Sequence, residues 1–279
     1  MTDSVPEQFR VLFAQEMLRP EEDIQLDRAA LYLAGQFCPE MELEQHLKRL
    51  EGLAEQVKAA VSPEASPGHW AEALSHVLFR QAGLRGNTED YYNPGNSYIN
   101  RVLETGLGIP ITLSVIYMEV ARRLGISCSG IGLPGHFIVG LPDLDLYVDP
   151  FHQGNLLSAM DCRRLIKEMF GERLSWQPEF LAPCTKREIL FRMLTNLKQI
   201  FVSGDQYPLV IATLQQMTVV HPEQASLYKE LAWCHLRLQQ PRSALKCLER
   251  FQELASPSDH PEQVVQQLHL LRAALESSG

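Results

Sequence analysis

Apolar residues recur at three- and four-residue intervals through the first 90 residues, and this spacing is typical of helices. An apolar cluster, Ala29–Ala34, predicts a helix that begins near Asp27. The clearest stripe predicts an amphipathic helix and consists of Leu43, Leu47, Leu50, Leu53, Ala54 and Val57. A turn-rich stretch, Ser62–Gly68, precedes a further helix over Trp70–Ala82. We therefore expect residues 1–90 to form a helical part of the chain.

After residue 90 the pattern changes, because short β-branched and aromatic runs alternate with Gly and Pro. One helix is predicted here, since Pro110 and Gly125 frame an apolar segment in the order that helix ends prefer. Three short strands are also predicted: one within Cys128–Leu133, one that begins at His136 and one that ends at Asp149. We expect this helix and a small antiparallel sheet to form the core of a domain.

From residue 186 onward the chain is helical again and repeats itself. Core-type positions recur 34 residues apart when Leu194, Leu197, Phe201, Val210, Leu214, Met217 and Pro222 are aligned with Tyr228, Leu231, His235, Ala244, Leu248, Phe251 and Ser256. This period is typical of tetratricopeptide (TPR) repeats, which are pairs of packed helices. A last helix over Glu262–Glu276 is predicted to cap the stack. A plain helical bundle is the alternative interpretation of two such degenerate copies.

Charge and hydropathy narrow the classes of function. The net charge is -9 and the pI is near 5.5, which argues against a nucleic-acid partner. The sequence begins without a basic and apolar leader, and no apolar run approaches the ~18 residues of a membrane span. We therefore expect a protein with neither a nucleic-acid nor a membrane partner.

The cysteines indicate a reducing compartment. None of the six, which are Cys38, Cys128, Cys162, Cys184, Cys234 and Cys247, forms a CxxC pair or lies near a histidine cluster with metal-ligand spacing. The pattern therefore predicts no metal site and no cofactor. Ordinary buried thiols in a chain of this length are typical of a cytoplasmic protein. Cys234 and Cys247 fall in helical patterns and are predicted to fill the core.

The two runs that flank Leu141–Leu144 predict a β-hairpin that brings a histidine and an aspartate together. With a four-residue loop Gly140 pairs with Asp145, and counting back along both strands places His136 opposite Asp149. An imidazole and a carboxylate so placed can hydrogen-bond, and the carboxylate then orients the ring for proton transfer. A buried histidine that is bonded to a carboxylate for structural reasons is the alternative interpretation.

Polar residues gather before and at the start of the predicted central helix. Asn96, Ser97 and Asn100 precede the helix, and Thr112 lies in its first turn. Asn and Ser are preferred in turns and as helix caps, so a structural role is one interpretation. The sharper hypothesis is that these four residues line a pocket beside His136.

Several long segments form a specific pattern over nearly the whole chain: NPGNSYINRVLETGLGIPITLSVIYMEVARRLGI, GLPGHFIVG, YVDPFHQG and RMLTNLKQIF with the repeats that follow it. On these residues the chain resembles the SirB-type transglutaminase-like/TPR proteins of bacteria. The resemblance implies an α+β fold with a papain/transglutaminase-like core in residues 1–185, made of a helical part (1–90) and a part with antiparallel strands (91–185). An α-helical TPR-like region in residues 186–279 would follow. The resemblance also implies a link to regulation of gene expression.

The resemblance bears on catalysis, because active transglutaminase-like cores begin the central helix with a nucleophilic cysteine. Counted from Gly125, that position is Pro110 in this sequence, while His136 and Asp149 match the other two members of the triad. A proline has no thiol, and it also gives up one of the N–H groups that favour a thiolate at a helix N-terminus. The resemblance thus implies the fold and two members of a triad, but not acyl transfer.

Two functions from different classes follow. The first is a non-catalytic protein, a pseudoenzyme, whose TPR-like region binds a protein or peptide. The second is a hydrolase or acyl transferase that combines the His136–Asp149 pair with an unusual nucleophile. Thr112 and Ser114 offer only neutral hydroxyls, and Cys128 lies on a strand-like segment rather than at the helix start. We therefore favour the first.

Overall fold

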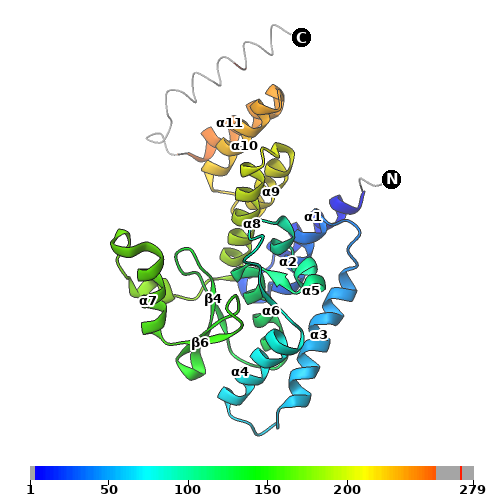
Figure 1. The fold of residues 1–279 in the computed structure, drawn as a ribbon. Coiled ribbons are helices and arrows are strands. Elements are labelled where there is room, and N and C mark those ends of the chain that lie inside the picture. Colours follow the sequence, from blue (N-terminus) through cyan, green and yellow to red (C-terminus); the bar gives the residue numbers. More distant parts are fainter. Residues whose placement is uncertain (1–3, 256–270, 272–279) are drawn as a thin grey trace. The chain divides into compact units, whose positions relative to one another are not determined.

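The computed structural model describes residues 4–255 and residue 271. The chain divides into two compact units, residues 1–193 and residues 194–279. The α-helices of the first unit are α1 (Ser4–Met17), α2 (Leu26–Gly35), α3 (Leu43–Ala60), α4 (Pro67–Ser75), α5 (Ile99–Thr105), α6 (Pro110–Arg123) and α7 (Ala159–Phe170), coloured from blue to green in Figure 1. The predicted helical character of the first 90 residues is confirmed.

One predicted helix has different bounds. The segment predicted as Trp70–Ala82 begins at Pro67, after Ser66, whose hydroxyl accepts a hydrogen bond from the His69 backbone N–H. After Ser75 it passes into a π-helical turn, His76–Gln81. The pattern of apolar residues therefore located the helix, and the capping residue Ser66 decided where it begins.

Helix α6 is buried at the centre of the first unit. Its residues from Pro110 to Ala121 are buried except for Met118. It contacts α2, α3, α4 and α5 as well as the strands β3 and β4. Gly125, at φ +71, follows its end, so the Pro-first and Gly-last prediction for this helix is confirmed.

The main sheet is antiparallel and follows the order of the chain. Its strands are β3 (Ser129–Ile131), β4 (Ile138–Leu141), β5 (Leu146–Asp149) and β6 (Asn155–Leu157). Ile131 lies opposite Ile138, and both pack with Cys162 and Ile166 of α7. Helix α7 therefore covers one face of the sheet, while α6 contacts β3 and β4 (Figure 1). A second, two-residue parallel pair joins β1 (Arg85–Gly86) to β2 (Leu107–Gly108), immediately before α6.

The predicted hairpin register was wrong by two residues. The structure pairs Leu141 with Leu146 and Gly140 with Tyr147, rather than Gly140 with Asp145. The reason is a 3-10 turn, Pro142–Leu144, that is followed by Asp145 in the left-handed conformation, so Asp145 belongs to the loop. The strand also begins at Ile138, two residues later than predicted. A shift of two keeps every side chain on its predicted face, whereas a shift of one would not.

The second unit is a series of helices that begins within α8 (Lys186–Ser203) and continues with α9 (Tyr207–Val220), α10 (Ala225–Arg237) and α11 (Pro241–Leu254). Helix α10 packs against both α9 and α11. Helices α9 and α11 lie 34 residues apart at both ends, and α8 and α10 end 34 residues apart. The boundary between the two units lies inside α8, after Met193, whereas the sequence predicted a boundary at residue 186, where α8 begins.

The aligned repeat positions lie mostly in the core. Leu194, Leu197 and Phe201 are buried in α8, and Leu248 and Phe251 are buried in α11. The helix bounds and this burial agree with the 34-residue period, while assignment to the TPR class stays a prediction. The capping helix predicted over 262–276 lies, apart from residue 271, outside the described residues. Among the described helices, none combines the length and the apolar character that a membrane crossing requires.

Candidate functional site

The last residue of β5 is the centre of the site. Asp149 is buried, and its Oδ2 lies 2.8 Å from Nε2 of His136 and 2.8 Å from Nδ1 of His152. His136 precedes β4 and is also buried, whereas about half of the His152 side chain is exposed. The predicted contact between His136 and Asp149 is therefore present. Continuing the observed register by one pair puts Ile138 opposite Asp149, so His136 reaches the carboxylate diagonally.

A tight turn after β5 brings His152 back over Asp149. The other carboxylate oxygen, Oδ1, accepts hydrogen bonds from the backbone N–H groups of Phe151 and His152, at 3.1 and 3.2 Å. The Gly154 N–H donates to the Asp149 carbonyl at 2.8 Å, and both Gln153 and Gly154 have positive φ angles. Aspartate is favoured in such turns because its side chain can bond backbone groups two and three residues on.

Sequence reasoning missed His152. The available signal was the spacing of a histidine three residues after a strand-ending aspartate, in a segment that also contains Pro150 and Gly154. That spacing alone does not predict a contact, since the contact depends on the backbone path through Pro150 and Phe151, the two residues between Asp149 and His152.

Asp149 is held in its ionised form. Burial alone would raise the pKa of its carboxyl, but hydrogen bonds and charge interactions with His136 and then His152 outweigh burial and lower it. The carboxylate therefore fixes the orientation of both rings.

One aromatic ring, that of Phe151, lies beside both histidines. The Phe151 ring lies edge-on to His136 at 6.3 Å between centroids and to His152 at 5.2 Å. Phe151 also lies against Gly86, whose strand pairs with β2 through Gly86 and Gly108. Because β2 leads directly into α6, this contact links the site to the segment before the central helix.

The start of α6 lies near the segment that carries His136. Ser114, one turn after Pro110, donates a hydrogen bond to the Phe137 carbonyl at 3.5 Å. Residues four apart share a helix face, so Pro110 lies on the face that meets this segment. Pro110 itself is buried. Its assignment as the lost nucleophile position stays a prediction that these contacts support.

The hydroxyl of Thr112 is occupied by structural bonds. It accepts from the Ile109 N–H at 3.1 Å and donates to the Asn96 carbonyl at 2.7 Å. The Asn96 side chain in turn donates to the carbonyls of Asp90 and Tyr91. Thr112 and Asn96 thus tie the start of α6 to the loop before α5, which is how capping residues act.

The other two pocket candidates lie beside them. Ser97 ends the 3-10 turn Pro94–Ser97, and Asn100 lies in the first turn of α5, which begins at Ile99. Both are exposed by 2% or less. The four candidates therefore share one buried polar neighbourhood, and a role in lining a pocket stays a prediction.

Burial disfavours the reactive thiolate form of all six cysteines. Burial is the largest influence on each cysteine and raises the pKa of every one, to about 12 for Cys128 and to about 11 for Cys162 and Cys234. Cys128, which the sequence offered as a substitute nucleophile, thus has the character of a structural thiol.

Pockets open on both sides of His152. One is lined by Arg85, Gly86, Thr88, Phe151, His152, Gln153 and Asn155. The other is lined by Asp149, His152, Asn155, Leu157, Asp161, Arg164, Leu165 and Glu168, and so reaches α7. The exposed edge of the His152 ring is therefore accessible to small solutes from two directions.

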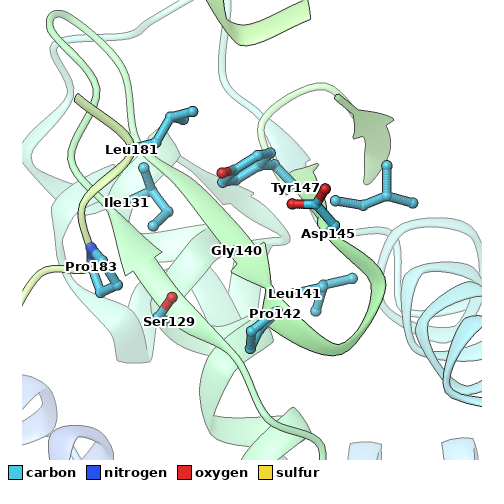
Figure 2. A pocket seen from close by; sticks show the side chains of 10 residues that line it. Ser129, Ile131, Gly140, Leu141, Pro142, Asp145, Tyr147, Leu181 and Pro183 are labelled. Carbon is cyan, nitrogen blue, oxygen red and sulfur yellow. The ribbon is translucent and has the colours of Figure 1, made fainter. Parts of the chain in front are cut away.

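A further pocket lies on the sheet, toward the turn of the β4–β5 hairpin. Figure 2 shows it between β3, β4, β5 and the segment that carries Leu181 and Pro183. Gly140 lies close to Ser129 in this pocket, since a Cβ there would come within 3.2 Å of the Ser129 hydroxyl. This pocket contains none of the residues His136, Asp149 and His152.

Comparison with known proteins identifies the family. Residues 44–195, which include β3 to β6 and the Asp149 site, match the family described as the transglutaminase-like superfamily. A UPF0162 protein of Xylella fastidiosa strain Temecula1 is 32% identical over 245 residues, which cover 86% of this chain and 87% of the relative. The chain belongs to the transglutaminase-like superfamily and to the UPF0162 family.

Other relatives are more distant. A UPF0162 protein of Pseudomonas aeruginosa is 28% identical over 225 residues, covering 81% of this chain and 83% of that protein. Human F-box only protein 21 is 29% identical over 169 residues, which are 56% of this chain and 26% of that protein. The transglutaminase-like part of the expected fold is therefore shown, together with the bacterial relatives.

Proposed function

We propose that this protein acts by binding a protein or peptide, and that its transglutaminase-like core does not carry out thiol-based acyl transfer. The observation that carries this proposal is that burial raises the pKa of all six thiols. The thiolate is the nucleophilic form of cysteine, and burial disfavours it at all six positions. Pro110 stands where the resemblance places the catalytic cysteine.

The second unit offers a surface suited to a protein partner. Trp233 of α10 is 44% exposed, and its ring lies 5.5 Å from that of Tyr207 on α9. The Arg237 guanidinium stacks over both rings, at 4.8 Å from Trp233 and 5.9 Å from Tyr207. Trp, Tyr and Arg are the residues most enriched at binding hot spots. The 34-residue period adds support, because stacked repeats of that kind present binding surfaces.

The test is a pull-down from cell extract with the full chain as bait. We expect Trp233→Ala to lose the proteins that the wild-type chain retains, and Tyr92→Ala, which removes a 72% exposed tyrosine of the first unit, to retain them. Truncation of a hot-spot tryptophan costs about 2 kcal/mol or more, so affinity for a recovered partner should fall by roughly 30-fold. Equal retention by Trp233→Ala would contradict the proposal for this surface.

The resemblance also links such proteins to regulation of gene expression. If that link applies here, the net charge of -9 favours an effect through a protein partner rather than through direct contact with DNA.

A hydrolase or acyl transferase is the second candidate, and one observation favours it. The 2.8 Å contact between His136 and Asp149 is the orienting half of a nucleophilic triad. Hydroxyl- and thiol-directed acylating probes separate the two candidates. Labelling that disappears in His136→Ala but persists in His69→Ala, an exposed histidine at the start of α4, would establish this candidate and remove the non-catalytic one.

A further inference from the structure

His152 has no part in the proposed binding function, yet it completes a cluster. Nε2 of His136, Nδ1 of His152 and a carboxylate oxygen of Asp149 all lie within 4.8 Å of one another. Two imidazoles and one carboxylate form the donor set that Zn²⁺ and Fe²⁺ take in proteins with three protein ligands. We propose that His136, Asp149 and His152 bind a divalent transition-metal ion, for which Zn²⁺ is the best match.

The distances suit such an ion with a small adjustment. Ligand atoms at 2.0–2.2 Å from a tetrahedral zinc ion are about 3.4 Å apart. The two nitrogen–oxygen separations are now 2.8 Å, so each has to widen by roughly half an ångström. His152 can move to widen its own separation from Asp149, because its side chain is 54% exposed. The separation between His136 and Asp149 has to widen by small rotations of two buried side chains.

The carboxylate is already oriented for this role. The backbone N–H groups of Phe151 and His152 hold Oδ1, which leaves Oδ2 directed at both imidazole nitrogens. Hydrogen bonds that fix a ligand carboxylate in this way are a regular feature of metal sites. Each imidazole would give up its hydrogen bond to Oδ2 and present the same nitrogen, in its neutral form, to the ion.

The surroundings of the three ligands favour a bound cation that keeps an open coordination position. The pocket on the α7 side contains the carboxylates of Asp149, Asp161 and Glu168 against the single guanidinium of Arg164. Pockets on both sides of His152 give water or a solute access to the remaining coordination positions. Zinc sites that keep such a position are the reactive kind, whereas structural zinc sites have four protein ligands.

The test is metal binding by the full chain after treatment with a chelator. Calorimetric titration with Zn²⁺ should give one ion per chain, and Co²⁺ should give visible ligand-field bands without the intense near-ultraviolet band of cobalt–thiolate bonds. Loss of a hydrogen bond to a ligand already weakens metal sites by about 10- to 100-fold. We therefore expect loss of a ligand itself, in His152→Ala or Asp149→Asn, to weaken binding by more than about 100-fold.

The control is His69→Ala, which removes an exposed histidine outside the cluster and should bind like the wild-type chain. Since Asp149 is buried, Asp149→Asn can fail to fold; His152→Ala removes an exposed ring and keeps the test decisive. Binding that persists in His152→Ala, a thiolate band with Co²⁺, or no binding by the wild-type chain at micromolar Zn²⁺ would each overturn the proposal. Those results would leave a hydrogen-bonded Asp–His–His cluster, and they do not bear on the protein-binding proposal.

Discussion

The position of Phe151 beside both histidines depends on a residue that has no side chain. A Cβ built on Gly86 would come within 2.5 Å of the Phe151 ring, far inside van der Waals contact. The ring would then have to leave its place beside His136 and His152. The neighbouring site is therefore sensitive to a single methyl group at a position that carries no chemistry of its own.

We expect Gly86→Ala to lower the free energy of unfolding by about 1–3 kcal/mol, the usual cost of overpacking. Gly52→Ala is the matched control. Gly52 lies within α3, and a Cβ added there would meet nothing within 4 Å, so alanine should raise the free energy of unfolding by about 0.5–1 kcal/mol through helix propensity. Urea denaturation of the three proteins measures both effects. Equal stability of Gly86→Ala and the wild-type chain would contradict the packing.

At the scale of elements, α6 is joined to α2 by a network of charges whose two carboxylates are buried. Asp27 of α2 accepts from Arg122 and Arg123 of α6, and Glu119 accepts from the same two arginines. Both carboxylates are 3% exposed. Burial, then the neighbouring charge of Asp27, raises the pKa of Glu119 although the arginines oppose the rise.

The raised pKa of Glu119 makes the stability of the protein depend on pH. The folded protein keeps the Glu119 proton to higher pH than the unfolded chain does, so the free energy of unfolding falls as pH rises from about 4.5 through the folded-state pKa. Glutamine cannot titrate. We therefore expect the stability of the wild-type chain relative to Glu119→Gln to fall across that window, in denaturant titrations at several pH values. A difference that stays constant or rises with pH would show that the pKa is not raised.

The start of α6 can be tested as the lost nucleophile position. In Pro110→Cys a thiol would stand at a helix N-terminus, where the dipole and nearby N–H groups favour the thiolate. Since Pro110 is buried, the matched comparison is with the three buried native thiols, Cys38, Cys162 and Cys234. We expect iodoacetamide to modify the introduced thiol at least about 10-fold faster than these three, and addition of His136→Ala to slow it. Mass spectrometry of the labelled peptides gives the rates. An equal rate with and without His136→Ala would contradict the assignment of residue 110 as the nucleophile position.

At the scale of the whole molecule, the burial of the thiols describes the packing of both units. Cys38 and Cys162 are buried in the first unit and Cys234 in the second, while Cys128, Cys184 and Cys247 are partly buried. Their reaction with solvent reagents therefore reports how often each region opens.

We expect Cys38, Cys162 and Cys234 to react with a disulfide reagent at least about 100-fold more slowly in the native protein than in guanidinium chloride, because their sulfurs are reached only when the structure opens. Timed quenching and mass spectrometry assign each site. A native protein in which one of these three reacts at its denatured rate would contradict the packing described for that unit.

Local signals account for what could be predicted. Pro110 and Gly125 bound α6, and the stripe from Leu43 to Val57 located α3, because helix ends and helix faces depend on residues a few positions apart. The 34-residue period likewise agrees with the bounds of α9 and α11. The contact between His136 and Asp149 was also predicted, since a register error of two residues keeps both on one face.

The sequence by itself thus determined α2, α3 and α6, the strands β3 to β5 and the face shared by His136 and Asp149, all of which rest on short-range patterns. Helix α7 and the strands β1, β2 and β6 were not predicted. Only the tertiary structure decided the hairpin register, through the left-handed conformation of Asp145. It alone brought His152 to Asp149, through the turn in which Asp149 Oδ1 accepts from the backbone N–H groups of Phe151 and His152. The path of such a turn depends on the packing around it as well as on residue type, so the spacing of His152 after Asp149 does not by itself predict the third member of the candidate metal site.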